Sequence, residues 1–272
     1  MSSKSSTPGS VRLSDGAQIT YDVWESTNVS RPPLLLLPSI GGGRSVWGKF
    51  RDELGRHVTT LAVDPRGFGE SSQIPMTFGT VELGQDVAEL VKTLGISRCD
   101  VFGISFGGMV ATNLALENEG LVRRLALAST PESGADFTPE GFTKALELGR
   151  CLIASADPKA CLAHELSASR VEEVERVSAE AADIKPNSRA DLLHLLAIAR
   201  QHRPELKLSP QRPRSLLIAG ECDPLLPHAK LSEFSRRLAA EFMLIPGVGH
   251  DVVVEAPEAV AELVLEFISR PD

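Results

Sequence analysis

The pattern of hydrophobic and polar positions predicts alternating strands and helices in the first half of the chain. The short, continuously apolar run Leu34–Leu37 is typical of a strand buried on both faces. Apolar residues near helical spacing predict a helix over Val81–Leu94. The same reading predicts strands at 10–14, 18–24, 57–63, 100–104 and 124–128, and a helix at 106–117.

The C-terminal part repeats this alternation, with predicted strands at 215–219 and 242–245 and helices at 229–240 and 257–269. Strands that alternate with helices form right-handed βαβ units, which place the strands in one largely parallel sheet. The sequence therefore predicts the α/β fold class.

The middle of the chain has a different pattern. From 131 to 210 no strand pattern is found, and helical stretches are expected near 139–152, 157–168, 170–182 and 188–200. We expect an α/β core at 10–130 and 211–272, with 131–210 as an all-helical cap over the carboxyl edge of the sheet. The alternative is a set of helices packed elsewhere for stability alone.

Composition and charge narrow the function classes. The formal charge of −8 argues against a nucleic-acid binder, because phosphate contacts need a basic face. No apolar run approaches the roughly 18–20 residues that a membrane span needs, so we expect no membrane partner. The polar start at 1–9 is expected to be a disordered leader without a signal peptide, and the four cysteines show no zinc-like spacing. Together these features favour a cytoplasmic protein with reduced thiols.

One candidate for chemistry is Ser105, which lies in the stretch VFGISFGG between a predicted strand and a predicted helix. A residue that turns this corner alone has a strained backbone, so its neighbours at ±2 must be small. Gly103 and Gly107 are those neighbours. A strand–turn–helix context makes the pattern a nucleophile elbow.

A serine hydroxyl needs a base that a third group orients. Of the six histidines, His250 is the best candidate, since it follows the last predicted strand in the glycine-containing loop GVGH. For the acid, Asp223 follows the strand 215–219 directly, and Glu221 is its local competitor. The order Ser, Asp, His along the chain is the order of α/β-hydrolases.

The chain resembles the α/β-hydrolase fold superfamily from about residue 10 to residue 270. Four blocks carry the resemblance: LLLLPSIGGG, DPRGFGES, GISFGG, and the pair GECDP and GVGHD. It implies a mostly parallel eight-stranded sheet flanked by helices, with a cap inserted. By position it implies Ser105 as nucleophile, His250 as general base and acid, and Asp223 as the orienting acid.

The resemblance also implies an oxyanion hole built from the backbone N–H groups of Ile40 and Phe106. Most relatives have His-Gly before the oxyanion residue, whereas this chain has Pro38-Ser39. Ser39, Gly41 and Trp47 are the candidate substrate contacts. DPRGFGES is interpreted as a structural turn beside the elbow, with a chemical role for Arg66 as the alternative.

These residues favour acyl transfer on a small ester by an acyl-enzyme mechanism. The oxyanion loop, DPRGFGESS and GISFGGM most resemble the group that includes 3-oxoadipate enol-lactonases, non-haem haloperoxidases and small carboxylesterases. A lactonase or a carbon–carbon bond hydrolase is therefore the second hypothesis. Non-hydrolytic catalysis (a lyase or cyclase) and a ligand receptor are the other classes. No metal or organic cofactor is implied, the expected partner is a small-molecule ester or lactone, and a homodimer is left open.

Overall fold

The fold is described from a computed structural model, which covers residues 6–27, 31–40, 42–44, 46–154, 189–206 and 209–271, with no account of side chains at 148–154, 189 and 190. Its centre is one eight-stranded sheet in the order β1-β2-β4-β3-β5-β6-β7-β8. The strands are β1 Thr7–Arg12, β2 Gln18–Trp24, β3 Leu34–Leu37, β4 Thr60–Asp64, β5 Cys99–Ile104, β6 Val122–Ala128, β7 Arg214–Gly220 and β8 Glu241–Ile245. β2 pairs antiparallel with both of its neighbours, β1 and β4, and the other five pairs are parallel, which confirms the predicted fold class.

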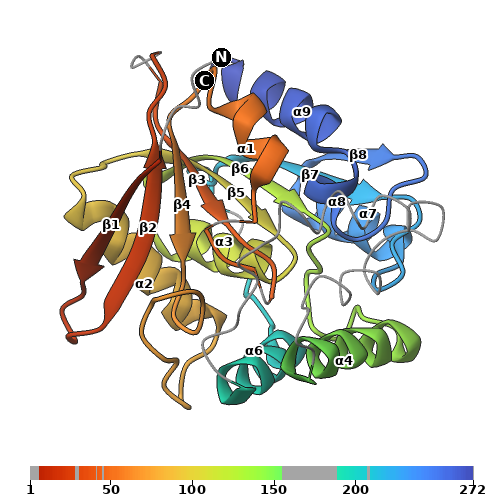
Figure 1. Cartoon of the computed structure of the whole chain (residues 1–272). Coiled ribbons are helices and arrows are strands. Elements are labelled where there is room, and N and C mark those ends of the chain that lie inside the picture. The colour runs from red at the N-terminus through yellow and green to blue at the C-terminus, as the bar shows by residue number, and fades with distance from the viewer. Residues whose placement is uncertain are drawn as a thin grey trace.

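Helices cover both faces of the sheet (Figure 1). They are α1 Gly48–Leu54, α2 Thr80–Thr93, α3 Phe106–Glu117, α4 Pro139–Ala154, α6 Arg189–Gln201, α7 His228–Leu238, α8 Val252–Glu255 and α9 Pro257–Ser269. The apolar faces of α2, α3 and α7 form one core with the sheet, and those of α1, α8 and α9 form a second core on its other face. Side chains alternate between the two cores along β3, which explains its continuously apolar sequence.

The predicted leader at 1–9 and the predicted cap at 131–210 have different outcomes. Residues 7–9 belong to β1, where Thr7 pairs with Val23, so the expected leader is wrong for these three residues. Within 131–210 the described residues contain α4 and α6 and no strand. The predicted helices at 157–168 and 170–182 lie outside the described residues, and the cap therefore stays a prediction.

The described helices of this middle region lie near the carboxyl ends of the strands, together at the bottom of Figure 1. Gly141 of α4 lies against the loop after β7, so closely that a Cβ there would overlap the carbonyl oxygen of Leu225. Asp191 of α6 accepts a hydrogen bond from the backbone N–H of Ile74, in the loop after β4, at 3.4 Å. Both helices thus touch loops at the edge where ligands bind in open α/β sheets.

The end of α6 is fixed to the core by His202, whose side chain is 3% exposed. Its Nδ1 lies 2.9 Å from the hydroxyl of Thr80, which also accepts a hydrogen bond from Asn113 at 2.9 Å. Burial, with a smaller contribution from the nearby Arg203, lowers the pKa of His202 from 6.5 to about 4. The folded protein therefore holds this imidazole neutral.

This pKa predicts an acid-dependent loss of stability. Between pH 6.5 and 4 the unfolded chain binds a proton at His202 and the folded chain does not, so stability falls as the pH falls through this window. The loss by pH 4.5 should be about 2–3 kcal/mol. Urea denaturation at pH 7 and pH 4.5 measures it, and His202→Asn should show a smaller pH dependence by that amount. An equal pH dependence in both proteins would contradict the prediction.

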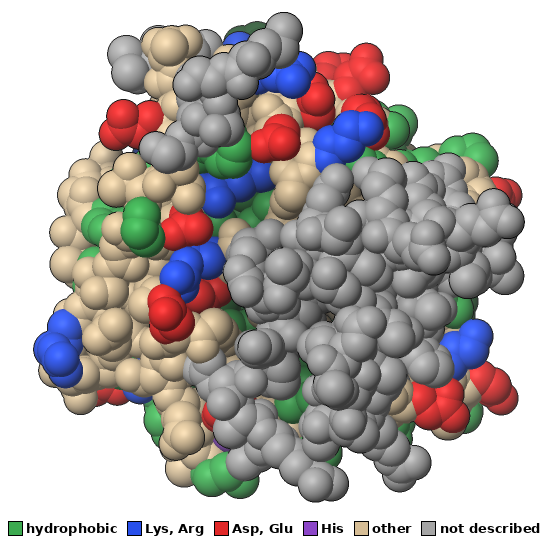
Figure 2. Space-filling view, viewed as in Figure 1, with side chains coloured by type: hydrophobic (Ala, Val, Ile, Leu, Met, Phe, Trp, Pro, Cys, Tyr) green, Lys and Arg blue, Asp and Glu red, His purple; other side chains and the backbone are tan. Residues whose placement is uncertain are grey.

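The described surface mixes charges of both signs. On the face in Figure 2, Lys and Arg side chains lie beside Asp and Glu side chains. Among the ion pairs of the described residues, Arg270 lies 2.6 Å from Glu241 and 2.9 Å from Glu266. None of the helices in the described ranges has the length and apolar composition to cross a membrane.

Candidate active site

The elbow at Ser105 is formed by the direct passage of β5 into α3. Ser105 has φ 51° and ψ −114°, a sparsely populated conformation that costs of the order of 1–3 kcal/mol. A Cβ at Gly103 would lie 2.6 Å from the carbonyl oxygen of Gly107, and one at Gly107 would overlap the carbonyl oxygen of Leu37. The two glycines are therefore required by close backbone contacts on both sides of the serine.

His250 lies next to the elbow, with Nε2 2.9 Å from Ser105 Oγ. Its Nδ1 lies 2.8 Å from Asp223 Oδ2. The imidazole and the Asp223 side chain are each 1% exposed, and Ser105 is 9% exposed. The structure thus brings the three predicted residues into one hydrogen-bonded row, which ends at the hydroxyl.

Asp223 is held by its own loop. Its Oδ1 accepts hydrogen bonds from the backbone N–H groups of Leu225 at 2.8 Å and Leu226 at 3.0 Å. These bonds leave Oδ2 to face the histidine. The competing carboxylate, Glu221, instead accepts the backbone N–H of Gly247 at 3.0 Å, so the geometry favours Asp223 as the partner of His250.

The loop that carries His250 is joined to the loop that carries Asp223. Cys222 N–H donates to Val248 O at 2.8 Å, between the two loops. Glu255, which is 2% exposed, accepts the backbone N–H of Gly249 at 2.9 Å. This buried carboxylate was not anticipated from the sequence, although an acidic residue at the end of the apolar run VVVE is a signal for a specific partner.

The two predicted oxyanion donors lie on adjoining segments. Phe106 is the first residue of α3, so its N–H has no acceptor within the helix and lies at the positive end of the helix dipole. The loop after β3 is pressed on this helix, since a Cβ at Gly107 would overlap the carbonyl oxygens of Leu37 and Pro38. No hydrogen bond joins the N–H of Ile40 to a described residue.

The three predicted substrate contacts have different outcomes. Ser39 is partly exposed, and its carbonyl accepts the N–H of Gly42 at 3.1 Å, whereas Gly41 lies outside the described residues. Trp47 is 1% exposed and packs its ring on Phe50 and Phe102, with centroids 6.0 and 5.9 Å away. The expectation of a substrate contact is corrected for Trp47, because it belongs to the core between the sheet and α1.

The DPRGFGES turn has the predicted structural role. Arg66 is 4% exposed and donates to Asp86 at 2.6 and 3.0 Å and to Asp15 at 2.6 Å. Phe68 packs on Phe106, with ring centroids 6.0 Å apart, which connects this turn to the first residue of α3. Arg66 thus joins two carboxylates within the fold.

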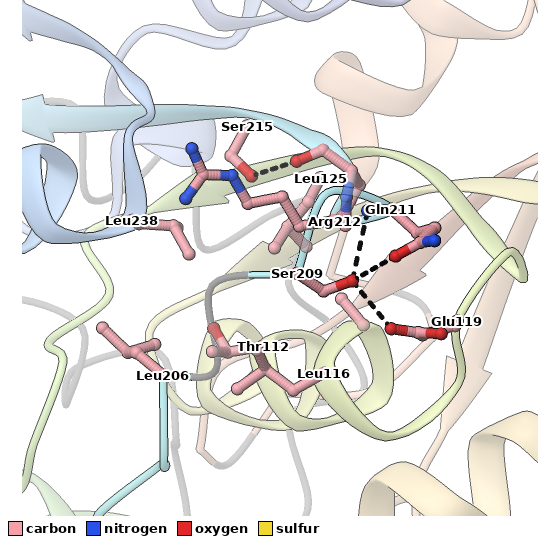
Figure 3. Close-up of a pocket in the computed structure, with 12 residues that line it drawn as sticks. Thr112, Leu116, Glu119, Leu125, Leu206, Ser209, Gln211, Arg212, Ser215 and Leu238 are labelled. Carbon is pink, nitrogen blue, oxygen red and sulfur yellow. Dashed lines mark hydrogen bonds between the residues drawn. The ribbon is translucent and has the colours of Figure 1, made fainter.

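The cavity shown in Figure 3 is separate from this site. It has a volume of about 80 Å³ and is lined by residues of α3, β6, β7 and α7 and of the loop before β7, and by none of the three residues of the row. Its rim is internally bonded, since Ser209 Oγ donates to Glu119 at 2.8 Å. The cavity therefore has no part in the row formed by Asp223, His250 and Ser105.

Among the described residues no cluster of His, Cys, Asp and Glu has the arrangement of a metal site.

The comparisons with known proteins agree on one family. A family model described as "Alpha/beta hydrolase family" matches residues 34–263. The 2-(acetamidomethylene)succinate hydrolase of Mesorhizobium japonicum is 26% identical over 282 residues, which covers 94% of this chain and 94% of that protein.

Solved structures show the same fold. A hydrolase from Pseudomonas aeruginosa is 27% identical with a TM-score of 0.78, covering 97% of this chain and 98% of that chain. The enol-lactonase from Burkholderia xenovorans is 21% identical with a TM-score of 0.77, covering 96% of this chain and 100% of that chain. At 21% identity the second likeness concerns the fold alone.

Proposed function

The chain belongs to the alpha/beta hydrolase family, and from that premise we propose that it is a serine hydrolase that cleaves a carboxylic ester of a small organic substrate. The observation that carries the proposal is the row of hydrogen-bonding atoms from Asp223 through His250 to Ser105, with distances of 2.8 and 2.9 Å. A hydroxyl beside a base that a buried carboxylate orients is the arrangement of nucleophilic acyl transfer.

The protonation state of the row follows from its chemistry. The Asp223 carboxylate can only accept a hydrogen bond, so Nδ1 of His250 carries the hydrogen. Nε2 of the neutral ring is then the acceptor for the Ser105 hydroxyl. With the hydrogen assigned to Nδ1 in this way, the ring has the tautomer that a general base needs.

The reaction proceeds in two halves. Ser105 Oγ bonds to the ester carbonyl carbon while its proton passes to His250 Nε2, and the imidazolium is stabilised by Asp223. His250 then gives this proton to the leaving alcohol oxygen as the carbon–oxygen bond breaks. A water molecule repeats both proton transfers on the acyl-enzyme, which releases the acid and restores the serine.

The negative oxygen of each tetrahedral intermediate requires hydrogen-bond donors. The N–H of Phe106 at the start of α3 and the N–H of Ile40 on the adjoining loop are the proposed donors. Neither donates to another group in the described part of the chain, which leaves both for the substrate.

A panel of substrates tests the proposal. We expect turnover of p-nitrophenyl esters, with kcat/KM varying with acyl length, and slower turnover of the matched p-nitroanilides. No turnover of any ester by the folded protein would overturn the assignment of ester hydrolysis.

A second candidate is cleavage of an acyl–nitrogen bond, which the name of the Mesorhizobium japonicum relative favours. The same attack and the same oxyanion donors serve this reaction, but His250 must then protonate a nitrogen leaving group. Anilides cleaved faster than esters of the same acyl group would select this candidate. Faster opening of lactones than of open-chain esters would instead select the lactonase hypothesis.

A further inference from the structure

The loop between β3 and α1 contains Arg44, whose guanidinium contacts three carboxylates. Nη1 donates to Asp64 Oδ2 at 2.6 Å and to Thr20 Oγ1 at 2.9 Å, and Nη2 donates to Glu70 Oε2 at 2.7 Å. Nε lies 3.2 Å from Asp22 Oδ1. The side chain of Arg44 is 21% exposed and that of Asp64 only 1%, so the contact between these two is largely shielded from water, whereas Glu70 is an exposed partner.

The backbone of the loop is bound to the same carboxylate. Arg44 N–H donates to Asp64 Oδ1 at 2.6 Å, so one aspartate binds both the main chain and the side chain of Arg44. Asp64 is 1% exposed and lies at the end of β4. A Cβ at Gly43 would come within 3.0 Å of Asp64 Oδ1, and one at Gly69 would overlap the carboxylate. The glycines thus allow the loop and the DPRGFG turn to close around this carboxylate.

Contacts must fix this loop, because its sequence alone restricts the backbone little. Residues 41–43 are three consecutive glycines, which have the largest backbone freedom of any residue. The segment leaves the sheet at Leu37 and packs Ile40 partly against the core, and beyond Ile40 the described residues are attached through the backbone and side chain of Arg44. Ile40, the proposed oxyanion donor, lies between these two attachments.

We propose that Arg44 is a positioning residue for the reaction: by clamping the glycine loop onto Asp64, it holds the N–H of Ile40 where the oxyanion forms. The inference rests on the proposed function, since it concerns one of the two donors assigned above. Arg44 would thus affect the rate of the reaction although it does not touch the reacting atoms. It also gives a reason for the close fit of Gly43 and Gly69 to the carboxylate.

Arg51 is a matched control, because its substitution distinguishes a loss of loop positioning from a general loss of stability. Arg51 of α1 is 5% exposed and, like Arg44, approaches Asp22: its Nη2 donates to the carbonyl of Asp22 at 3.2 Å and its Nε to Thr60 at 3.2 Å. Neither of these side-chain hydrogen bonds is made to the loop after β3. Arg44→Gln and Arg51→Gln both remove a shielded guanidinium, so both should lower the thermal midpoint, but only the first releases the loop.

The experiment measures kcat, KM and the inhibition constant of an aryl trifluoromethyl ketone for the wild type and both variants. This probe adds to a nucleophilic serine as a tetrahedral hemiketal, whose oxygen requires the same donors as the oxyanion. Arg44→Gln should lower kcat about 10²-fold with KM nearly unchanged. The inhibition constant of the ketone should rise by about the same factor by which kcat/KM falls. Arg44→Lys keeps one charged contact, so its kcat and its affinity for the ketone should lie between those of Arg44→Gln and those of the wild type.

Three results would overturn the proposal: an Arg44→Gln kcat within about twofold of the wild type, a lowered kcat with unchanged ketone affinity, or an equal loss in Arg51→Gln. Failure of the proposed function is distinguishable, because the wild type would then neither hydrolyse esters nor bind the ketone. A variant that does not fold, as judged by circular dichroism, is replaced by Arg44→Lys in the same comparison.

Discussion

Ser105→Ala is expected to lower kcat for a p-nitrophenyl ester by about 10⁶-fold, the largest effect of any single substitution in this chain. The change removes only the hydroxyl that lies 2.9 Å from His250 Nε2. The alanine keeps a Cβ in the same strained conformation, with φ near 51°, so the fold and KM should change little. Steady-state kinetics on the purified variant, with circular dichroism as a check on folding, measures the effect.

Ser129 provides a matched control for this substitution. It is also buried, also has a positive φ (44°), and directly follows the neighbouring strand β6. Its hydroxyl has no hydrogen-bond partner in the described part of the chain. Ser129→Ala should therefore keep kcat within about threefold. Retained activity in Ser105→Ala, or an equal loss in both variants, would show that the nucleophile is misassigned.

Asp223→Asn is expected to lower kcat by about 10⁴-fold. Asp223 Oδ1 accepts two backbone N–H groups, so an asparagine keeps its oxygen there and turns its NH₂ toward His250. Nδ1 of the ring must then accept a hydrogen bond, which moves the ring proton to Nε2. With its hydrogen on Nε2 the neutral imidazole cannot accept the proton of Ser105.

The neighbouring carboxylate supplies the control for this effect. Glu221→Gln keeps an oxygen that can accept the N–H of Gly247, and should leave kcat within about threefold of the wild type. Kinetics of the two variants at several pH values distinguishes the carboxylates. If Glu221→Gln were the damaging change and Asp223→Asn were harmless, the assignment of the orienting acid would be reversed.

The parts of the fold that the sequence predicts best are those with a strong local pattern. β3 at Leu34–Leu37, α3 at Phe106–Glu117 and α9 at Pro257–Ser269 have the predicted bounds. The strand predicted from His57 begins later, at Thr60, because His57 and Val58 donate to the carbonyl of Leu54 and close the end of α1.

Other differences arise where tertiary contacts decide. The short helix α1 was not predicted, because its two turns show too little periodicity for a helix pattern. α7 was predicted to reach Ala240 but ends at Leu238, since Ala239 is left-handed and donates to the carbonyl of Arg236. Nothing in the apolar pattern marks that residue as a helix stop.

The residues of the candidate site also differ in how far the sequence alone predicts them. Ser105 and His250 could be chosen from the sequence because each follows a strand in a glycine-containing loop. The choice between Asp223 and Glu221 depends on which carboxylate the backbone of the loop turns inward, and only the N–H groups of Leu225 and Leu226 decide it. The clamp of Arg44 on Asp64 joins segments 20 residues apart, and no local pattern indicates it.

The central claim is that Ser105 forms the covalent acyl-enzyme, and covalent labelling with a fluorophosphonate tests it most directly. Peptide mass spectrometry of the inactivated protein should find one adduct, on Ser105, formed in step with the loss of esterase activity. Ser105→Ala should take up no label, and His250→Ala should take it up much more slowly. An adduct on another residue, or full inactivation with Ser105 unmodified, would contradict the account.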